Sequence, residues 1–514
     1  MLRINAVSSP AYYLSASGEW DRTGSWSGKS ADRLGIAGTP DTEAFRRLMA
    51  NRTPDGQKLT PRDHAERRTG YDLTFSEPKS VSIFRELTGD DRIDRAREES
   101  VREVMRSVVE PLAATRERRL FGFRPVETGN LAWLDFHHRL GRPVKGVPEM
   151  NGHTHVVIPN CTRSGNRHLA LEIRPIKEAA PLIQAAWHAS YASKLKGLGY
   201  DIRPTKDAFE IAGVHDSTIR KFTGRSELIE LEAKRREVRS PKGRAALGAL
   251  TRERKQANVD PDKLLAAWRD RLTKAEEQAL TETHHRAMVA TPELEASSDA
   301  RHVSDALSWH LKTASAVPED KLLETALRRG VGEVTLEGLR AALDDVDAGD
   351  MVRVAMPEGP HVTTVAAMRR EKEVLDFADG GAITIRRTKR GERVEARPGE
   401  TLVPHAEKLG FDQLHALVYE GRPLLLHAEA MRDYRKPARG EVLAVLEDLG
   451  KLPTGQKRPG VKLTERVARV GKGLQKRLVA NWTWLRRIEM TQQGEGVGHG
   501  VSPGQDLRER GLER

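Results

Sequence analysis

Four short apolar runs, separated by helical segments, most constrain how the first 290 residues fold. Each run is rich in the β-branched, aromatic and other apolar residues that favour strands: Tyr71–Phe75, Leu131–Phe136, Thr154–Ile158 and Phe209–Ile211. Between them, apolar residues recur at helical spacing in Pro78–Arg85, Arg95–Val109 and Pro181–Gly197. We therefore predict an α+β domain, with an antiparallel or mixed sheet covered by helices.

The cysteine count and the apolar content exclude several classes of protein. The 514 residues contain one cysteine, Cys161, so no disulfide can form within the chain and a zinc finger is excluded. No run approaches the roughly 18 to 20 apolar residues that a membrane span needs. The N-terminus lacks the apolar region of a secretory signal. We therefore expect a cytoplasmic protein of roughly two to four domains.

The net charge of +12 favours a polyanionic partner, and phosphate backbones are the usual one. Residues 214–290 are predicted to be helical and basic. Within 234–255, basic residues far outnumber the two acidic ones, and they are Lys234, Arg235, Arg236, Arg239, Lys242, Arg244, Arg252, Arg254 and Lys255. This segment either follows a DNA backbone or is an ordinary solvated surface, and composition alone leaves both interpretations open.

The remainder of the chain divides into three parts by pattern. Residues 300–402 begin with helical spacing and continue with short β elements around turns. Residues 403–488 are predicted to be helical and basic, and packing explains their pattern as well as DNA binding does. Residues 489–514 are polar and Gly-rich, which predicts a disordered tail.

Histidines at strand positions indicate a metal site. His153 and His155 flank Thr154 in a strand-like run, so their side chains share one face of the strand. His138 follows the strand-like run Leu131–Phe136, and the loop at 141–152 then turns the chain back toward His153, which makes His138 the best third ligand. Three neutral nitrogen ligands leave coordination positions free for substrate oxygens, as in catalytic sites. Surface histidines are the commoner explanation of an isolated His-x-His pair.

An acidic residue and a lysine lie at a predicted strand–helix junction. Asp72 precedes the end of the strand, where it orients a histidine ligand or accepts a proton. Ser76 is predicted as the N-cap of the next helix, with Pro78 in its first turn. Lys79 then lies near a helix N-terminus, a position that favours phosphate. Alone, Lys79 is also consistent with a solvated lysine.

Tyr12 and Tyr13 are adjacent near the start of the chain. Such pairs are usually packing residues, but a tyrosine acts as a covalent nucleophile where a metal polarises its electrophile. Three features thus follow one another along the chain: the tyrosine pair, then residues 70–82, then the histidines.

Together these features resemble the MobF-type conjugative relaxases of the HUH endonuclease superfamily. That family has an N-terminal tyrosine pair, a motif like G-x-D-L-T-F-S-A-P-K-S-V-S, matched here at residues 70–82, and a segment leading from G-N-L to H-T-H. Gly129-Asn130-Leu131 and the histidines match the last segment, and Trp26–Lys29 resembles a further motif near the start. The resemblance covers residues 1–290 and implies an HUH-type relaxase domain with a central antiparallel sheet.

The resemblance continues more weakly into residues 302–382, which look like the segment before the helicase motor of longer members. No G-x-x-x-x-G-K followed by Ser or Thr occurs, so these residues include no P-loop. The chain therefore looks like a relaxase with a truncated or replaced helicase half. Three departures stand out: no second tyrosine pair in 14–26, a loop that ends in Glu149–Gly152 instead of D-P-Q-L, and Glu77 in place of a small residue.

The resemblance implies a chemistry for the site. Tyr12 is expected to attack one DNA strand, with Tyr13 in reserve, giving a 5′-phosphotyrosine and a free 3′-hydroxyl. The three histidines are expected to bind a divalent ion, Mg²⁺ or Mn²⁺, with Zn²⁺ or Co²⁺ also acceptable to imidazoles. Single-stranded DNA at an origin of transfer is the expected substrate. The predicted DNA-contacting residues are Lys79, Arg235, Arg236, Arg239, Lys242 and Arg244.

Further partners and alternatives follow from the same interpretation. A type IV secretion coupling protein, an accessory DNA-binding protein and a separate helicase are expected partners. A rolling-circle replication initiator would use the same chemistry in another process. A non-catalytic DNA-binding scaffold would keep the fold without the reaction, although loss of function usually begins at residues such as those retained here.

Overall fold

The computed structural model describes residues 1–14, 20–61, 63–64, 66–119, 122–253, 259–290, 298–345, 350–356 and 359–370. The chain divides into two compact units. The first comprises Met1–Ala306 together with Asp320–Asp345, and the second comprises Leu307–Glu319 and the residues from Val346 onward. The predictions for 403–488, for 489–514 and for the β elements beyond residue 370 lie outside the described residues.

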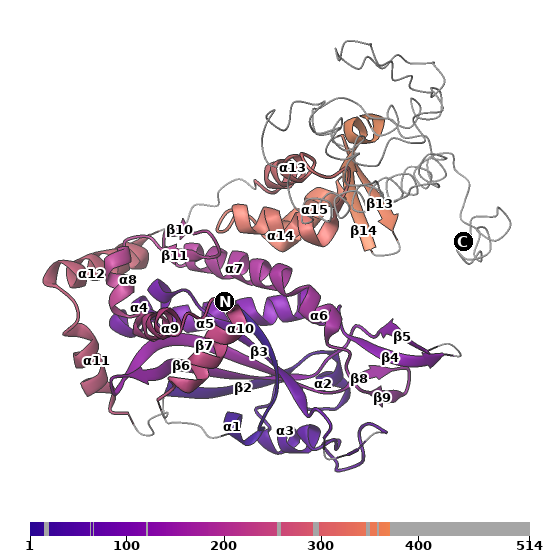
Figure 1. Ribbon diagram of the computed structural model, residues 1–514, viewed down its shortest axis with the longest axis horizontal. Coiled ribbons are helices and arrows are strands. Elements are labelled where there is room, and N and C mark those ends of the chain that lie inside the picture. Colours follow the sequence, from indigo (N-terminus) through magenta and orange to yellow (C-terminus); the bar gives the residue numbers. More distant parts are fainter. Residues whose placement is uncertain are drawn as a thin grey trace, which may run out of the picture. The chain divides into compact units, whose positions relative to one another are not determined.

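A five-stranded antiparallel sheet forms the centre of the first unit (Figure 1). Its spatial order is β1-β3-β7-β6-β2. The strands are β1 (Leu2–Ala6), β3 (Gly70–Ser76), β7 (Val147–Pro159), β6 (Trp133–Val144) and β2 (Asp21–Ser27). The predicted antiparallel sheet is thus confirmed. Three of the four predicted runs lie in it, and they form its three central strands.

The fourth predicted run lies elsewhere. Phe209–Ile211 forms β11, which pairs with β10 (Ile202–Pro204) in a separate two-stranded ladder. Two further hairpins flank the main sheet: β4 (Ala114–Arg119) with β5 (Gly122–Glu127), and β8 (Thr162–Ser164) with β9 (Arg167–Leu169). Short apolar runs predict strands but not which sheet they join, because pairing partners are set by long-range packing.

Three predicted helices are present, and two of them cover one face of the sheet. The helices are α4 (Lys79–Thr88), α5 (Arg92–Val104), which continues into the π-helical turn Met105–Val109, and α7 (Ala180–Gly197). Figure 1 shows α5 and α7 on the same side of the strands. On that face the rings of Phe75 and Trp187 lie 5.3 Å apart between centroids, so α7 packs directly on β3.

The N-terminal boundary of α4 differs from the prediction. Ser76 is the last residue of β3, and the N-cap is Pro78, which makes no side-chain capping bond. The helix ends at Thr88 and is capped by Gly89, whose φ of 73° lies in the left-handed region that glycine adopts without strain. Proline at the cap fits because it has no N–H group to leave unsatisfied.

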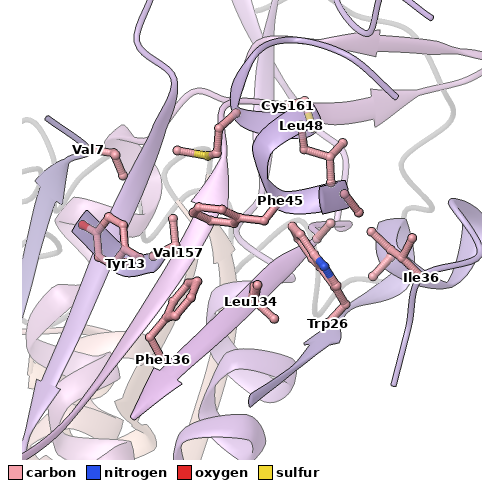
Figure 2. Close-up of a cluster of buried hydrophobic side chains, with 14 of the residues drawn as sticks. Val7, Tyr13, Trp26, Ile36, Phe45, Leu48, Leu134, Phe136, Val157 and Cys161 are labelled. Carbon is pink, nitrogen blue, oxygen red and sulfur yellow. The ribbon is translucent and has the colours of Figure 1, made fainter. Parts of the chain in front are cut away.

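The opposite face of the sheet carries a second core. Figure 2 shows Tyr13, Phe45, Trp26, Phe136 and neighbouring aliphatic side chains packed together there. They come from α1 (Ala11–Leu14), α3 (Thr42–Met49) and the central strands. Phe45 and Phe136 lie 5.2 Å apart between ring centroids, in the edge-to-face geometry that aromatic pairs prefer. Both faces of the sheet are therefore covered.

Residues 214–290 are helical, as predicted. They form α8 (Asp216–Lys221), α9 (Gly224–Arg235), α10 (Pro241–Leu250), α11 (Pro261–Arg269) and α12 (Lys274–Val289). They are anchored on the β6–β7 hairpin, where Glu253 accepts from the backbone N–H groups of Lys145 and Gly146 at 2.9 and 3.1 Å. The buried Trp268 indole donates to the carbonyl of Pro148 at 3.0 Å. The basic helices are thus tied to the two longest strands.

The chain continues through α13 (Asp299–His310), α14 (Glu319–Arg329) and α15 (Leu336–Asp344), which agree with the helical spacing predicted at the start of 300–402. The second unit contains an antiparallel sheet of order β12-β14-β13, formed by Val317–Pro318, Gly359–Thr364 and Met351–Met356. None of the helices in the described ranges is long and apolar enough to cross a membrane.

Candidate active site

One face of the central sheet brings together the histidines and Asp72. Residues directly opposite each other in adjacent strands share a face. His138 pairs with His153, and Thr74 pairs with His155, two residues along β3 from Asp72. This is the face covered by α1 and α3, since Phe136, which pairs with His155, packs with Tyr13 and Phe45 from those helices (Figure 2). Alternation along each strand therefore assembles the predicted residues.

The three histidine rings form a tight cluster. The ring centroids lie 5.2 Å apart for His138 and His153, 5.2 Å for His138 and His155, and 5.1 Å for His153 and His155. Among the residues that the structure describes, however, no group of three or more His, Cys, Asp or Glu side chains has the spacing of a formed metal site.

Each ring is held through its Nδ1 atom. The Nδ1 of His138 lies 2.5 Å from Asp21 Oδ1, and that of His155 lies 2.8 and 3.0 Å from the two carboxylate oxygens of Asp72. The Nδ1 of His153 lies 2.8 Å from the backbone carbonyl of Asn151. A hydrogen bond from Nδ1–H to such an acceptor selects the tautomer whose Nε2 carries no hydrogen and can bind a metal. Metal-ligating histidines are oriented in this way. The donor set therefore suits a divalent metal.

The protonation of His153 also suits a ligand. Burial lowers its pKa well below the usual value, and the neighbouring His155 and His138 lower it further. A neutral imidazole is the form that binds metal. The same physical cause lowers the pKa of His137, a buried residue on the opposite face of β6, which carries no proposed role.

The two adjacent tyrosines differ sharply in environment. The Tyr13 ring is in the core, and its hydroxyl donates to Asp72 Oδ2 at 3.1 Å. Burial, followed by the nearby Asp72 carboxylate, raises the Tyr13 pKa, so its phenolate form is disfavoured. The Tyr12 side chain is 41% exposed, and both rings lie near that of His155, at 6.1 Å for Tyr12 and 5.5 Å for Tyr13 between centroids. Consecutive helical positions point about 100° apart, which explains the difference.

Asp72 contacts several groups of the site. Besides Tyr13, it accepts from the Nδ1 of His155 and from the Thr74 hydroxyl at 3.2 and 3.3 Å. The sequence left two roles open for Asp72, proton acceptor or support for a histidine. Its bonds favour the second role, because both carboxylate oxygens already contact His155.

Lys79 does not lie where a phosphate contact was expected. Its ammonium donates to the backbone carbonyl of Met150, and burial lowers its pKa. The N-terminus of α4 is also occupied, because Glu210 accepts from the backbone N–H of Ser80 at 2.8 Å. A carboxylate thus takes the place at which a phosphate was expected, and a contact between Lys79 and DNA is not favoured by this arrangement.

The predicted DNA-binding arginines lie on the surface of α9, α10 and the loop between them. Arg235 and Arg236 both pair with Glu232, at 2.8 and 3.0 Å. Arg244 pairs with Glu230 at 3.0 Å. Arg239 is exposed and Lys242 belongs to α10. Surface pairs of this kind are weak, so phosphates compete for these arginines at little cost.

Asp21 is the site residue that sequence reasoning missed. It stands opposite His138 across the β2–β6 pair, and its side chain is only 4% exposed. No local pattern identifies Asp21 as a site residue, because the sequence around it, with Trp20 before and Arg22 after, is typical of an edge strand. Its importance arises from strand register alone.

Comparisons with known proteins give a consistent family. The family model described as TrwC relaxase matches residues 3–275. The multifunctional conjugation protein TraI of Escherichia coli strain K12 is 35% identical over 270 residues, covering 50% of this chain and 14% of TraI. A second TraI of Escherichia coli is 33% identical over 270 residues, with the same coverage. The matched segment is therefore a small part of these relatives.

Solved structures of a conjugative relaxase, TrwC, are also similar. A complex of TrwC with oriT DNA in a metal-free form is 30% identical, covers 55% of this chain and 99% of that one, and has a TM-score of 0.48. A metal-bound complex with oriT DNA is 29% identical, with the same coverage and TM-score.

Proposed function

Because the chain belongs to the TrwC relaxase family, we propose that it nicks and rejoins one strand of DNA at an origin of transfer, and so initiates conjugative mobilisation. The observation that carries this proposal is the exposed Tyr12 beside the cluster of three histidines. Tyr12, the proposed nucleophile, and the three histidines that would act on the scissile DNA phosphate lie on one side of one sheet.

In this proposal the Tyr12 oxygen attacks the phosphorus of the scissile phosphodiester. A bond forms between phosphorus and the Tyr12 oxygen, and the bond from phosphorus to the 3′ oxygen breaks. The Tyr12 proton is lost to solvent, and the departing 3′ oxygen takes up a proton to become a hydroxyl. One phosphate ester replaces another, so rejoining requires no ATP.

His138, His153 and His155 would hold the divalent metal, which supplies electrophilic activation of the phosphate. Asp21 and Asp72 keep two of these rings in a single orientation through Nδ1. Tyr13 packs in the core and donates to Asp72, so its part is to hold that carboxylate. The three oriented imidazoles support a divalent metal for this chain, with Mg²⁺ or Mn²⁺ as the proposed ion and Zn²⁺ or Co²⁺ as alternatives.

The proposed substrate is single-stranded DNA, and the basic helices lie along its phosphate backbone. Arg235, Arg236, Arg239, Lys242 and Arg244 are proposed to contact its phosphates. The helices reach the site strands through the contacts of Glu253 and Trp268 with the β6–β7 hairpin. A type IV secretion coupling protein, an accessory DNA-binding protein and a separate helicase remain proposed partners.

The other functions raised by the sequence find less support. The matching family model is a relaxase model, and both curated relatives are conjugation proteins. Neither favours a replication initiator or a scaffold without activity.

The test is a cleavage assay with single-stranded oligonucleotides from DNA flanking the gene, in Mn²⁺ or Mg²⁺, on a denaturing protein gel. We expect a metal-dependent covalent protein–DNA band that is lost in Tyr12→Phe. Binding in a gel shift without any covalent band, for every flanking sequence and metal, would instead support the scaffold.

A further inference from the structure

His153 is held differently from the other two histidines of the proposed site. His138 and His155 are oriented by carboxylates from neighbouring strands, Asp21 and Asp72. His153 is oriented by the carbonyl of Asn151, two residues back in its own strand. The Asn151 side-chain amide also lies 3.2 Å from the same Nδ1 atom, so the direction of the His153 ring depends on residue 151 and on the backbone that places it.

That backbone departs from a regular strand. His138 pairs with His153, but Leu140 pairs with Met150, so two residues of β7 stand against the single Arg139 of β6. This is the pattern of a β-bulge, which interrupts the ladder and redirects side chains. A bulge needs other partners for its backbone groups, because buried N–H and C=O groups are costly when unpaired.

Gly152, in the bulge, is held from the β3 side of β7 by a ring of hydrogen bonds. Its carbonyl accepts from the backbone N–H of Glu77 at 3.1 Å. Its own N–H donates to the hydroxyl of Ser82 at 3.0 Å, and that hydroxyl donates to Glu77 Oε1 at 2.8 Å. Both backbone groups of Gly152 are thus tied to Glu77, one directly and one through Ser82.

Glu77 is itself fixed. Its other oxygen, Oε2, accepts from Arg97 Nη1 at 3.0 Å and from the Tyr191 hydroxyl at 2.9 Å. The side chains of Glu77 and Arg97 are 0% and 1% exposed. Position 152 must be glycine, because a Cβ atom there would overlap the carboxylate of Glu77 and the guanidinium of Arg97. The bulge is therefore built against a buried ion pair.

We propose that Glu77 and Ser82 are positioning residues for His153: their ring with Gly152 holds the bulge that directs this imidazole toward the other two. The proposal rests on the proposed function, because it assumes that the three histidines bind metal. It assigns a role to Glu77, because the proposed chemistry of the site does not otherwise require a glutamate before Pro78.

The experiment measures Mn²⁺ binding to the DNA-free full chain by calorimetry, with the melting temperature determined in parallel. Ser82→Ala removes the link from the Gly152 N–H to the Glu77 carboxylate and leaves the direct backbone bond between the two residues in place. Ser80→Ala is the matched control, because Ser80 is buried in the same helix and accepts from one backbone N–H, that of Ile211 at 2.7 Å. Both variants leave one backbone donor unpaired, but only Ser82 contacts the bulge.

We expect both serine variants to melt at lower temperature, and only Ser82→Ala to bind Mn²⁺ more weakly, by about tenfold or more. Equal Mn²⁺ affinity in Ser82→Ala and wild type, or an equal loss in both variants, overturns the proposal. A wild-type chain that binds no Mn²⁺ overturns the metal site itself, so the two failures are distinguishable.

A second variant reaches the same ring from the strand. Gly152→Ala forces the ring open, whereas Gly197→Ala, at the end of α7, adds a Cβ that meets no neighbouring atom within 4 Å. We expect Gly152→Ala to lose Mn²⁺ affinity and Gly197→Ala to keep it. This pair decides the proposal if Ser82→Ala does not fold, and unchanged Mn²⁺ affinity in Gly152→Ala overturns it.

Discussion

Asp21 Oδ1 lies 2.5 Å from Nδ1 of His138, across the pairing of an edge strand with a central strand. Because outer carboxylates orient metal-binding imidazoles, Asp21→Ala is expected to weaken Mn²⁺ binding by about 10-fold to 100-fold. Asp21→Asn retains an acceptor oxygen and should lose less. Calorimetric titration of the three proteins with Mn²⁺ measures this order, and equal affinities would show that Asp21 has no orienting role.

Tyr13→Phe separates the two tyrosines. The variant loses the hydrogen bond to Asp72 but keeps the packed ring, so the free energy of unfolding should fall by about 1 kcal/mol. Covalent adduct formation should persist, because Tyr12 is unchanged. Chemical denaturation and the oligonucleotide assay test both points. Loss of the adduct in Tyr13→Phe, with retention in Tyr12→Phe, would exchange the two roles.

Phe45 contributes strongly to the core beneath the site. It is fully buried on α3, and its ring contacts Phe136 and Tyr13. Phe45→Ala should lower the free energy of unfolding by about 3 to 5 kcal/mol through lost burial and a cavity. Urea denaturation measures the change. A loss below about 1 kcal/mol would mean that the aromatic core rearranges to fill the space.

Stability should decrease as pH rises because of Asp135. This carboxyl is buried, and burial raises its pKa to about 7. The nearby Glu98 also raises the pKa, whereas three arginines lower it without offsetting the burial: Arg102, Arg22 and Arg106. Between its ordinary pKa near 4 and about 7, the folded chain keeps a proton that the unfolded chain loses, so the free energy of unfolding falls across this range.

Asp135→Asn removes this dependence. The variant should gain on the order of 1 to 2 kcal/mol in free energy of unfolding at pH 8. Its gain near pH 5 should be smaller, because the native carboxyl is then mostly protonated in the folded state. Denaturation at both pH values measures the difference, and a gain that is larger at pH 5 would contradict the assignment.

Removal of surface charge should weaken DNA binding without abolishing chemistry. The combined change of Arg235, Arg236, Arg239 and Arg244 to Ala should lower affinity for single-stranded DNA. On logarithmic axes, the slope of affinity against salt should become shallower by about 0.7 for each phosphate that an arginine no longer neutralises. Arg95→Ala is the control, since Arg95 is exposed and paired with Asp91 on α5. Fluorescence anisotropy over a range of salt concentrations tests this, and an unchanged slope would identify the helices as solvated surface.

Sequence patterns predicted the central strands because these strands are buried. β3, β6 and β7 carry the apolar runs expected of interior strands, and the predicted runs overlap them. The edge strands β1 and β2 were not predicted. Leu2–Ala6 and Asp21–Ser27 are partly exposed and contain polar residues, so their pairing leaves little mark on composition.

The helix start at residues 76–79 shows the limits of local rules. A serine followed by a proline two residues later is typical of a capped helix, but β3 extends through Ser76 to pair with His153. Lys79 was expected at a phosphate site for the same local reason. A carboxylate from β11 and the Met150 carbonyl occupy those positions instead, and neither is visible in the local sequence.

By itself, the sequence determined the residue types of the site, their order and the face shared by His153 and His155, because alternation along a strand is a local property. Only the tertiary structure decided which tyrosine is exposed, which carboxylate supports which imidazole, and that Glu77 lies against Gly152 and Arg97. Those relationships depend on strand register and on packing between segments far apart in the chain, which no local pattern encodes.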